Sequence, residues 1–315
     1  HCRSKDVMRI AAVDIGTNTI LLLIAEIDDN GNIHLLDHQQ YFPRLGSKLD
    51  GSKIINPEIF QKVASIINDY KAISHNLQAD SFIISATSAV RDAENQKIFI
   101  DFIKSKCRCE IIVLSGKEEA ELTFLGATSG FDFPSEEIIV VDIGGGSTEI
   151  TQYVSGVLKG ESLQIGAVRL TERFFLQSPP TKTEIKAAKK DINAHLSLIH
   201  LPPSSSKFNI GVAGTVTTLA CLNQHLKHFQ IEQVRGYHLS AIDIERWTNI
   251  LLSIEPVEIL KLSAATIGRE DIIGAGALIL NEIMKQYGFQ EIIVSERGLR
   301  HGMILQEWEI KSGHR

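Results

Sequence analysis

The chain has 315 residues, of which 43% are hydrophobic and 22% charged, and its formal net charge is −6. This length is typical of about two domains, and the acidic balance argues against a dedicated nucleic-acid or membrane-surface protein, which would need a basic excess. No apolar stretch approaches the ~20 residues of a membrane-spanning helix, and the four cysteines predict neither a disulfide framework nor a pair of metal-binding CxxC motifs. We therefore expect a cytoplasmic, globular, two-domain protein.

The first part of the chain is predicted to form three strands and then alternating helices and strands. Residues 28–32 have the composition of a hairpin turn between the second and third strands. A helix beginning at Pro57 follows the 3.6-residue apolar period. The predicted strands are 10–14, 20–27, 33–41, 82–87 and 110–114, and the predicted helices are one from 57, one over 94–107 and one from 118.

The same order of elements then repeats. The predicted strands are 138–142, 148–154, 157–163, 208–212 and 291–295, and the predicted helices are 184–199, 216–227, 242–252, 271–287 and one from 299. The four residues Val-Asp-Ile-Gly occur at 13–16 and again at 141–144, at the same place in both runs. We therefore expect an α/β protein of two duplicated βββαβα domains, 1–124 and 125–315, with the ligand in the cleft between them. The helix over 299–311 could pack back on the first domain.

Both copies of the repeated motif place an acid at the end of a buried strand, followed by a turn of small residues. Successive N–H groups in such a turn can form an anion site, and glycine lets the backbone approach a phosphate closely. A strand follows each turn, which excludes the Rossmann and Walker motifs because both open a helix. The simpler alternative is a pair of ordinary hairpin turns. If phosphate binds, Asp14 and Asp142 are candidates to hold Mg²⁺, which prefers one or two carboxylates plus phosphate oxygens.

The segment Ser115–Glu121 contains three glutamates with different expected roles. Ser115 and Glu118 fit a capping box, which gives Glu118 a structural role, and Glu121 is expected on a solvated helix face. Glu119 has no such explanation. It is either a surface residue or a base that orients and deprotonates water.

Arg91 follows a predicted strand, where ligand sites of open α/β sheets gather. Its guanidinium suits phosphate oxygens, although an ion pair with Asp92 or Glu94 is the simpler interpretation. Gly214 and Thr215 offer a helix amino terminus to an anion, or else allow close packing of a strand on a helix.

Two further basic groups receive simpler interpretations. The lysines between 182 and 190 are expected on a solvated helix face, with polyanion binding as the alternative. Arg297 and Arg300 are expected to form ion pairs at the start of the last helix.

These motifs resemble, in order and over nearly the whole chain, those of the exopolyphosphatase/guanosine pentaphosphate phosphatase (Ppx/GppA) family. The segments that carry the resemblance are 13–19 (VDIGTNT), 86–91 (ATSAVR), 115–120 (SGKEEA), 141–149 (VDIGGGSTE), 214–215 (GT) and 295–300 (SERGLR). The resemblance implies ribonuclease H-like domains of the actin/hexokinase/Hsp70 type. It also implies Mg²⁺-dependent removal of the terminal phosphate of inorganic polyphosphate, or of the 5′ γ-phosphate of pppGpp.

The resemblance assigns roles to individual residues. Glu119 would activate water, Asp142 would be a catalytic, metal-associated acid with Asp14 as its counterpart, and Glu149 would lie close to the metal. An arginine at 269 resembles one that precedes a family helix. The implied phosphate contacts are Gly16, Asn18, Thr19, Arg91, Gly144, Gly145, Gly146, Ser147, Thr148, Gly214 and Thr215. The chain departs from the family pattern at Thr17 and Thr19, which replace serines, and at Ala213, which replaces a glycine.

Among the functions considered, an exopolyphosphatase is favoured. A pppGpp 5′-phosphohydrolase and a non-catalytic (p)ppGpp sensor are the alternatives, and a kinase-like phosphotransferase is disfavoured because no acid for a substrate hydroxyl stands out. The expected partners are polyphosphate or guanosine penta- and tetraphosphate, without nucleic acid or membrane. A homodimer and a monovalent cation beside Mg²⁺ are left open.

Overall fold

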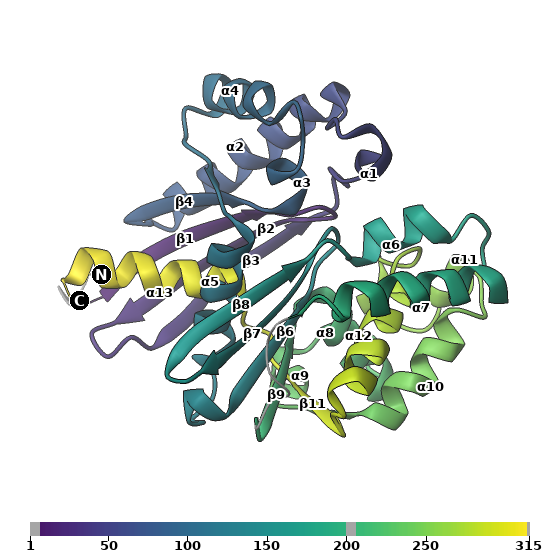
Figure 1. The fold of residues 1–315 in the computed structure, drawn as a ribbon. Coiled ribbons are helices and arrows are strands. Elements are labelled where there is room, and N and C mark those ends of the chain that lie inside the picture. Colours follow the sequence, from purple (N-terminus) through teal and green to yellow (C-terminus); the bar gives the residue numbers. More distant parts are fainter. Residues whose placement is uncertain (1–6, 200–205, 314–315) are drawn as a thin grey trace. The chain divides into compact units, whose positions relative to one another are not determined.

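The computed structural model describes residues 7–199 and 206–313 (Figure 1). Cys2 lies outside the described residues, whereas Cys107, Cys109 and Cys221 are free thiols. The chain divides into two compact units, described separately below. Unit 1 is His1–Gly126 with Leu299–Arg315, and unit 2 is Ala127–Gly298.

Unit 1 contains a five-stranded mixed sheet in the order β3-β2-β1-β4-β5. Its strands are β1 (Val7–Ile15), β2 (Ile20–Asp28), β3 (Ile33–Tyr41), β4 (Ser81–Ala86) and β5 (Ile112–Val113). The first three form an antiparallel meander, while β1 pairs with β4 in parallel. The hairpin turn between β2 and β3 is present as predicted, because the Asp28 carboxylate accepts bonds from the backbone N–H groups of Asn30 and Asn32.

Helices cover both faces of this sheet. One face buries apolar residues of α2 (Phe60–Asn76) and α4 (Gln96–Cys107), and the other those of α5 (Gly116–Thr128) and α13 (Leu299–Ser312). In α2 the predicted period is confirmed, since Val63, Ile67 and Tyr70 are fully buried. Short helical segments complete the unit: α1 (Leu49–Ser52), η1 (Pro57–Ile59) and α3 (Ser88–Arg91).

Unit 2 contains a six-stranded sheet in the order β10-β11-β9-β6-β7-β8. Its strands are β6 (Ile138–Ile143), β7 (Thr148–Val154), β8 (Val157–Leu163), β9 (Phe208–Val212), β10 (His238–Ser240) and β11 (Glu291–Val294). Read as β8-β7-β6-β9-β11, the order repeats that of unit 1, with β10 added at the edge. The duplicated α/β architecture predicted from the sequence is thus confirmed.

Most helices of unit 2 contribute apolar residues to one large core, to which the 3₁₀ turn η2 contributes none. The helical segments of the unit are η2 (Ser135–Glu137), α6 (Ala167–Phe174), α7 (Lys182–Leu196), α8 (Ala213–Asn223), α9 (Ile231–Val234), α10 (Ala241–Leu251), α11 (Pro256–Ile259), η3 (Ala264–Thr266) and α12 (Ile273–Tyr287). Helix α12 lies at the centre of this core, and its first twelve residues are all buried.

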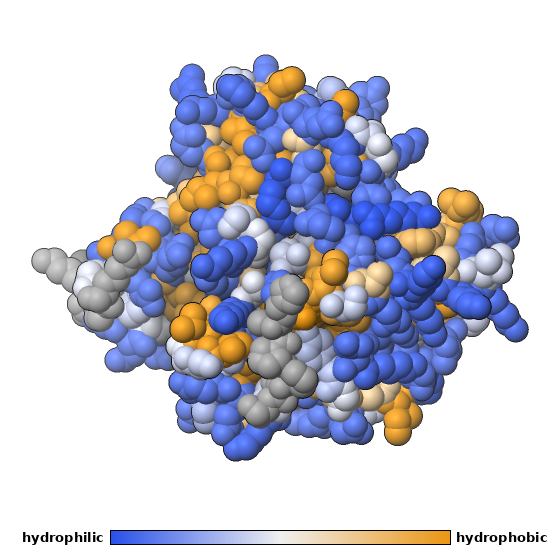
Figure 2. Space-filling view, in the orientation of Figure 1, coloured by the Kyte–Doolittle hydropathy of each residue, from blue (hydrophilic) through white to orange (hydrophobic). Residues whose placement is uncertain are grey.

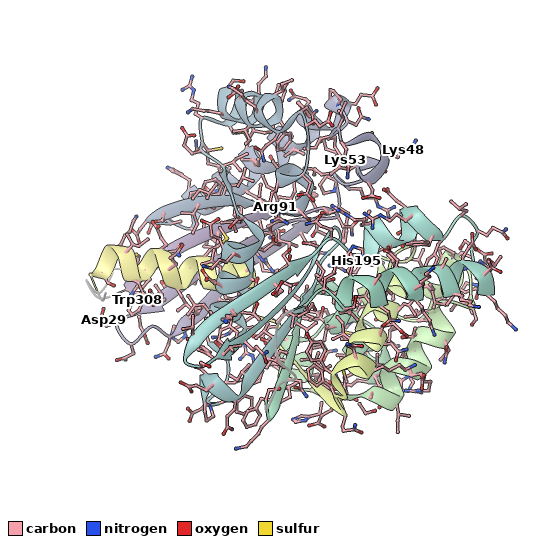
Figure 3. The ribbon with its side chains drawn as sticks, viewed as in Figure 1. Asp29, Lys48, Lys53, Arg91, His195 and Trp308 are labelled. Carbon is pink, nitrogen blue, oxygen red and sulfur yellow. The ribbon has the colours of Figure 1, made fainter. Side chains whose placement is uncertain are left out.

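The C-terminal helix packs back on the first unit, as considered from the sequence for residues 299–311, although the predicted division at residue 124 gave 125–315 to the second domain. Helix α13 belongs to unit 1, because Leu299, Met303 and Ile304 are buried in the core that also contains residues of β1 and β2. At the helix end, the Trp308 ring packs over the β2–β3 turn, where a Cβ on Gly31 would lie 3.4 Å from the ring. Figure 3 labels this tryptophan close to Asp29.

None of the helices within 7–199 and 206–313 combines the length and hydrophobicity needed to cross a bilayer. The face seen in Figure 2 is predominantly hydrophilic, with apolar residues in small scattered groups, as is usual for a globular surface.

Candidate active site

A tight turn joins β1 to β2 in unit 1. The backbone N–H of Gly16 donates to the Thr19 carbonyl at 2.9 Å, and a Cβ on Gly16 would lie 3.2 Å from that same oxygen. Thr17 and Asn18 are buried, and the Thr17 hydroxyl is hydrogen-bonded to that of Ser88 at 2.9 Å. The turn is therefore fixed against the first residue of α3.

Asp14 stands one residue before the end of β1, paired with Leu21 on one side and Ser85 on the other. Its side chain is partly exposed, but its Oδ1 atom is buried and has no hydrogen-bond partner among the residues that the structure describes. Burial raises the pKa of Asp14 to about 7, with a further contribution from the negative charge of Glu119 and an opposing one from Arg300. A buried carboxylate oxygen without a donor fits a cation ligand such as Mg²⁺.

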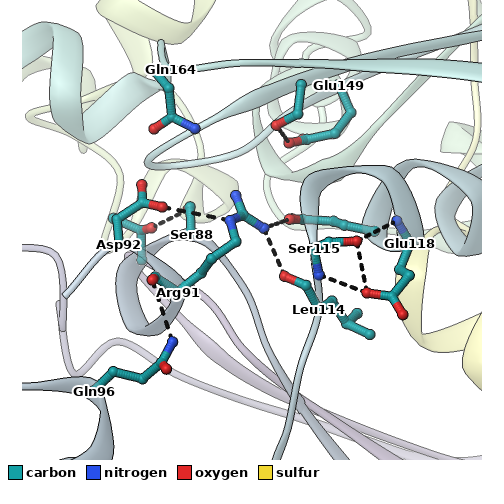
Figure 4. A network of polar contacts seen from close by, with 12 residues as sticks. Ser88, Arg91, Asp92, Gln96, Leu114, Ser115, Glu118, Glu149 and Gln164 are labelled. Carbon is teal, nitrogen blue, oxygen red and sulfur yellow. Dashed lines mark hydrogen bonds and ion pairs between the residues drawn. The ribbon is translucent and has the colours of Figure 1, made fainter. Parts of the chain in front are cut away.

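Arg91, the last residue of α3, is bonded to Glu119 in the first turn of α5. Its Nη1 atom donates to Glu119 Oε2 at 2.7 Å and to the Leu114 carbonyl at 3.0 Å, and its Nε lies 3.5 Å from Asp92. Figure 4 shows the guanidinium at the centre of this network. The expected ion pair with Asp92 is present. The hydrogen bond to Glu119 was not predicted, because its two residues lie far apart in the sequence.

Glu119 is 7% exposed, so it is not a surface residue. Burial raises its pKa, while the hydrogen bond and positive charge of Arg91 lower it. The Glu119 carboxylate stays ionised at neutral pH only because the positive charge of Arg91 lies beside it. The surface position considered from the sequence is therefore wrong, and the role of Glu119 as a base stays a prediction.

The neighbouring Glu118 has the predicted capping role. Its carboxylate accepts bonds from the Ser115 backbone N–H at 2.8 Å and hydroxyl at 2.7 Å, and its own backbone N–H donates to the Ser115 hydroxyl at 3.2 Å. These bonds hold the pKa of Glu118 below its usual range. Because the capping box fixes the start of α5, it also fixes the position of Glu119.

The turn between β6 and β7 in unit 2 repeats the geometry of the first turn. The Gly144 N–H donates to the Ser147 carbonyl at 3.0 Å, and a Cβ on Gly144 would lie 3.2 Å from it. Helix α6 begins against this turn, with Val168 N–H donating to the Gly145 carbonyl at 2.8 Å. A Cβ on Gly166 would lie 2.5 Å from the Gly145 carbonyl carbon, so only glycine permits this approach.

The acids of unit 2 lie at the same turn. Asp142 pairs with Glu149 across β6 and β7, and Glu149 is 2% exposed. Its Oε1 accepts a 2.7 Å bond from the Ser162 hydroxyl, and the Thr148 hydroxyl donates to the Ile165 carbonyl at 2.8 Å. Unit 2 thus assembles Asp142, Glu149 and the Gly144–Thr148 loop.

Gly214 and Thr215 form the first turn of α8, directly after β9. A Cβ on Gly214 would lie 2.1 Å from Nη1 of Arg269, and one on Gly276 would lie 2.5 Å from the Thr215 hydroxyl oxygen. The helix amino terminus considered from the sequence is therefore present, and the close contacts at Gly214 and Thr215 are with Arg269 and helix α12 rather than with a strand. Burial lowers the pKa of Arg269 to about 10, and its guanidinium lies against Gly214 at the amino terminus of α8. Ala213 adopts φ +67°, in the left-handed region.

Arg300 has a role that its local sequence did not predict, since an ion pair at the helix start was expected. Its Nη1 instead donates to the Leu22 carbonyl at 2.9 Å, and its charge lowers the pKa of Asp14. Leu22 is 278 residues away in the chain, so no local pattern could show this contact. Arg297 contacts Glu296 at 3.6 Å and the Ser129 carbonyl at 2.9 Å.

Each unit therefore assembles one set of predicted residues. Unit 1 brings together Asp14, the Gly16–Thr19 turn, Arg91 and Glu119, and unit 2 brings together the residues around its own turn and the start of α8. Among the residues that the structure describes, no group of three or more His, Cys, Asp or Glu side chains is placed to hold a metal ion.

The comparison with protein families decides the classification. The model of the Ppx/GppA phosphatase family matches residues 23–310. The chain belongs to this family. Its members are phosphatases that hydrolyse phosphoanhydride bonds.

Individual members of the Ppx/GppA family resemble the chain over almost its entire length. Exopolyphosphatase 2 of Mycobacterium tuberculosis is 30% identical over 311 residues, which cover 94% of this chain and 98% of that protein. The crystal structure of an exopolyphosphatase-like protein superposes with a TM-score of 0.90 at 30% identity, covering 96% and 98% of the two chains. The Aquifex aeolicus family member gives a TM-score of 0.82 at 28% identity, covering 98% and 100%.

Proposed function

We propose that this protein is an exopolyphosphatase that hydrolyses the terminal phosphoanhydride bond of inorganic polyphosphate and releases orthophosphate. The observation that carries the proposal is the buried Arg91–Glu119 pair, joined through Ser88 of α3 to the Gly16–Thr19 turn. Membership of the Ppx/GppA family and the similarity to exopolyphosphatase 2 of Mycobacterium tuberculosis support it.

Glu119 is proposed to act as the general base. Its carboxylate would orient a water molecule and take its proton as the water oxygen forms a bond to the terminal phosphorus. The bond from that phosphorus to the bridging oxygen breaks, and this oxygen leaves as the new end of the shortened chain. Arg91 would hold the Glu119 carboxylate in one orientation and keep it ionised.

The Gly16–Thr19 and Gly144–Thr148 turns and the amino terminus of α8 are proposed to bind phosphate oxygens through backbone N–H groups and hydroxyls. Arg269 would add a positive charge at the start of α8. Asp14 in unit 1, and Asp142 and Glu149 in unit 2, are proposed as ligands of Mg²⁺, which when bound would neutralise charge on the phosphate oxygens. The orphaned Oδ1 of Asp14 supports this assignment.

The acidic limb of the pH–rate profile provides a test of the Arg91 role. We expect Arg91→Met to move the apparent pKa of this limb upward, because the variant removes the hydrogen bond and the charge that lower the pKa of Glu119. The base form of Glu119 would then be lost at a higher pH as the solution is acidified. The measurement is kcat for phosphate release between pH 5 and 9, with Lys97→Met as the control. An unchanged acidic limb in Arg91→Met would contradict the role.

Asp14 provides a test of the cation site. We expect Mg²⁺ to raise the melting temperature of the wild-type protein, since a ligand that binds only the folded state stabilises it. Asp14→Asn should lose most of this Mg²⁺-dependent shift, as followed by differential scanning fluorimetry. An equal shift in both proteins would contradict the assignment.

The same variant has an expected effect without metal. Because the pKa of Asp14 is raised to about 7, ionisation of this carboxyl disfavours the folded state above that pH. In EDTA at pH 8.5, Asp14→Asn should therefore be more stable than the wild type by roughly 4 kcal/mol, because folding raises the pKa from 3.8 to about 7 and each pH unit is worth about 1.4 kcal/mol. The difference should shrink as the pH falls from 7 toward 4, because the wild-type carboxyl becomes protonated in the folded state.

A further inference from the structure

Residues 42–55 form a segment that we call the basic strap. In unit 1 it runs from the Gly16–Thr19 turn to the residues that follow Arg91. It follows β3, includes α1 and ends before η1. It carries three basic residues, Arg44, Lys48 and Lys53, and one acid, Asp50, which leaves a local charge of 3 − 1 = +2 in a chain whose total is −6. None of these basic residues belongs to the machinery described above.

One end of the strap is fastened to the Gly16–Thr19 turn. The Arg44 N–H donates to the Asn18 carbonyl at 3.2 Å, and the Gly46 N–H donates to the Thr17 carbonyl at 2.8 Å. A Cβ on Gly46 would lie only 2.1 Å from the Thr17 Cγ2 atom, so the two segments are in direct contact. The strap therefore begins at the turn proposed to bind the terminal phosphate.

The other end is fastened just beyond Arg91. The Glu94 N–H donates to the Lys53 carbonyl at 2.8 Å. The Asn95 side chain forms two bonds to Ile55, one from the Ile55 N–H at 2.9 Å and one to the Ile55 carbonyl at 2.8 Å. Between these ends, Leu45 and Leu49 are buried in the core. The strap is thus a fixed part of unit 1.

All three basic residues of the strap lie in the left-handed backbone region, with φ of 58° at Arg44, 60° at Lys48 and 56° at Lys53. This conformation costs a residue with a side chain ~1–2 kcal/mol and persists where the surroundings impose it, as is frequent at functional sites. Lys48 and Lys53 are exposed and Arg44 is partly exposed. Figure 3 labels both lysines beside α1 in the unit that carries Arg91.

We propose that the basic strap binds the phosphate groups that follow the terminal one, and that Arg44, Lys48 and Lys53 thereby set the affinity for long linear phosphate chains. The inference rests on the proposed function and assigns the strap to the same substrate. A chain with one negative charge per phosphate requires cations beyond its terminal group, and a segment with a fixed backbone provides them without a cost for ordering the backbone on binding.

The test compares two double variants that remove the same charge. Lys48→Gln/Lys53→Gln changes the strap, and Lys62→Gln/Lys97→Gln removes two exposed lysines from other helices of unit 1. For a chain of about fifteen phosphates, we expect the strap variant to raise KM about tenfold with kcat nearly unchanged, since each lysine contact is worth a factor of about three. For tripolyphosphate the rise should be less than threefold. The control should match the wild type, and Arg44→Gln should act in the direction of the strap variant.

Binding without turnover separates this inference from the proposed function. Calorimetry in EDTA with the fifteen-phosphate chain should show about tenfold weaker binding by the strap variant than by the control. If the wild type binds the chain but releases no phosphate, the proposed function fails while the strap assignment stands.

Three results would overturn the strap assignment. The first is equal KM and Kd values for the strap and control variants. The second is the absence of binding of the polyphosphate chain by the wild type. The third is a strap variant that loses affinity for pppGpp but not for polyphosphate.

Discussion

Glu119→Gln is expected to reduce kcat for phosphate release about 10³-fold, because a positioned general base contributes ~10²–10⁴-fold to a rate. The amide oxygen of glutamine can still accept the 2.7 Å bond from Arg91, so the local structure should be retained. The amide cannot take a proton from water. Binding of polyphosphate in EDTA should therefore stay within a factor of about three of the wild type.

The matched control is Glu121→Gln in the same helix. Glu121 is partly exposed and pairs with Lys117 across the surface of α5 at 3.7 Å, a contact worth less than ~1 kcal/mol. Its kcat should equal that of the wild type. Full activity in Glu119→Gln, or equal losses in both variants, would show that Glu119 is not the base.

Gly302→Ala is expected to destabilise the protein by about 3 kcal/mol, because overpacking a tight contact costs ~1–3 kcal/mol or more. A Cβ at residue 302 in α13 would lie 1.8 Å from the Leu122 carbonyl oxygen of α5. The Leu122 carbonyl oxygen belongs to the backbone, and a Cβ at residue 302 is bonded directly to the backbone. No side-chain rotation can therefore relieve the clash. Urea denaturation followed by circular dichroism measures the change.

The sign of this effect is informative, since helix propensity alone would make alanine about 1 kcal/mol more stable than glycine. Gly51→Ala serves as the control, because a Cβ there has no atom within 4 Å. It should be neutral or slightly stabilising. If Gly302→Ala is also stabilising, the close packing of α13 on α5 is incorrect.

The regular elements of the fold could be predicted because their patterns are local. Strands β3, β7, β8 and β9 have the predicted bounds, and the repeated Val-Asp-Ile-Gly located the two turns that share one geometry. The short helices α1, α3, α9 and α11 have four residues each, which is too few for a periodic signal. Helix α6 and strand β10 were also not predicted.

The candidate site was predictable in its members and unpredictable in its contacts. The capping role of Glu118 could be predicted because its partner, Ser115, is only three residues away. The environment of Glu119 depends on Arg91, which is 28 residues away in the chain. Arg300 was misinterpreted for the same reason, because its partner lies on β2. Burial decides these roles, and burial arises from packing that the local sequence does not contain.

The most direct test of the central claim is phosphate release by the purified wild-type protein with Mg²⁺, measured in parallel on tripolyphosphate, a chain of about fifteen phosphates and pppGpp. We expect steady release of orthophosphate from both polyphosphates, with the lower KM for the longer chain. Release from pppGpp alone would identify a pppGpp 5′-phosphohydrolase instead. No release from any of the three, together with tight binding of ppGpp, would contradict the hydrolase and leave a nucleotide sensor.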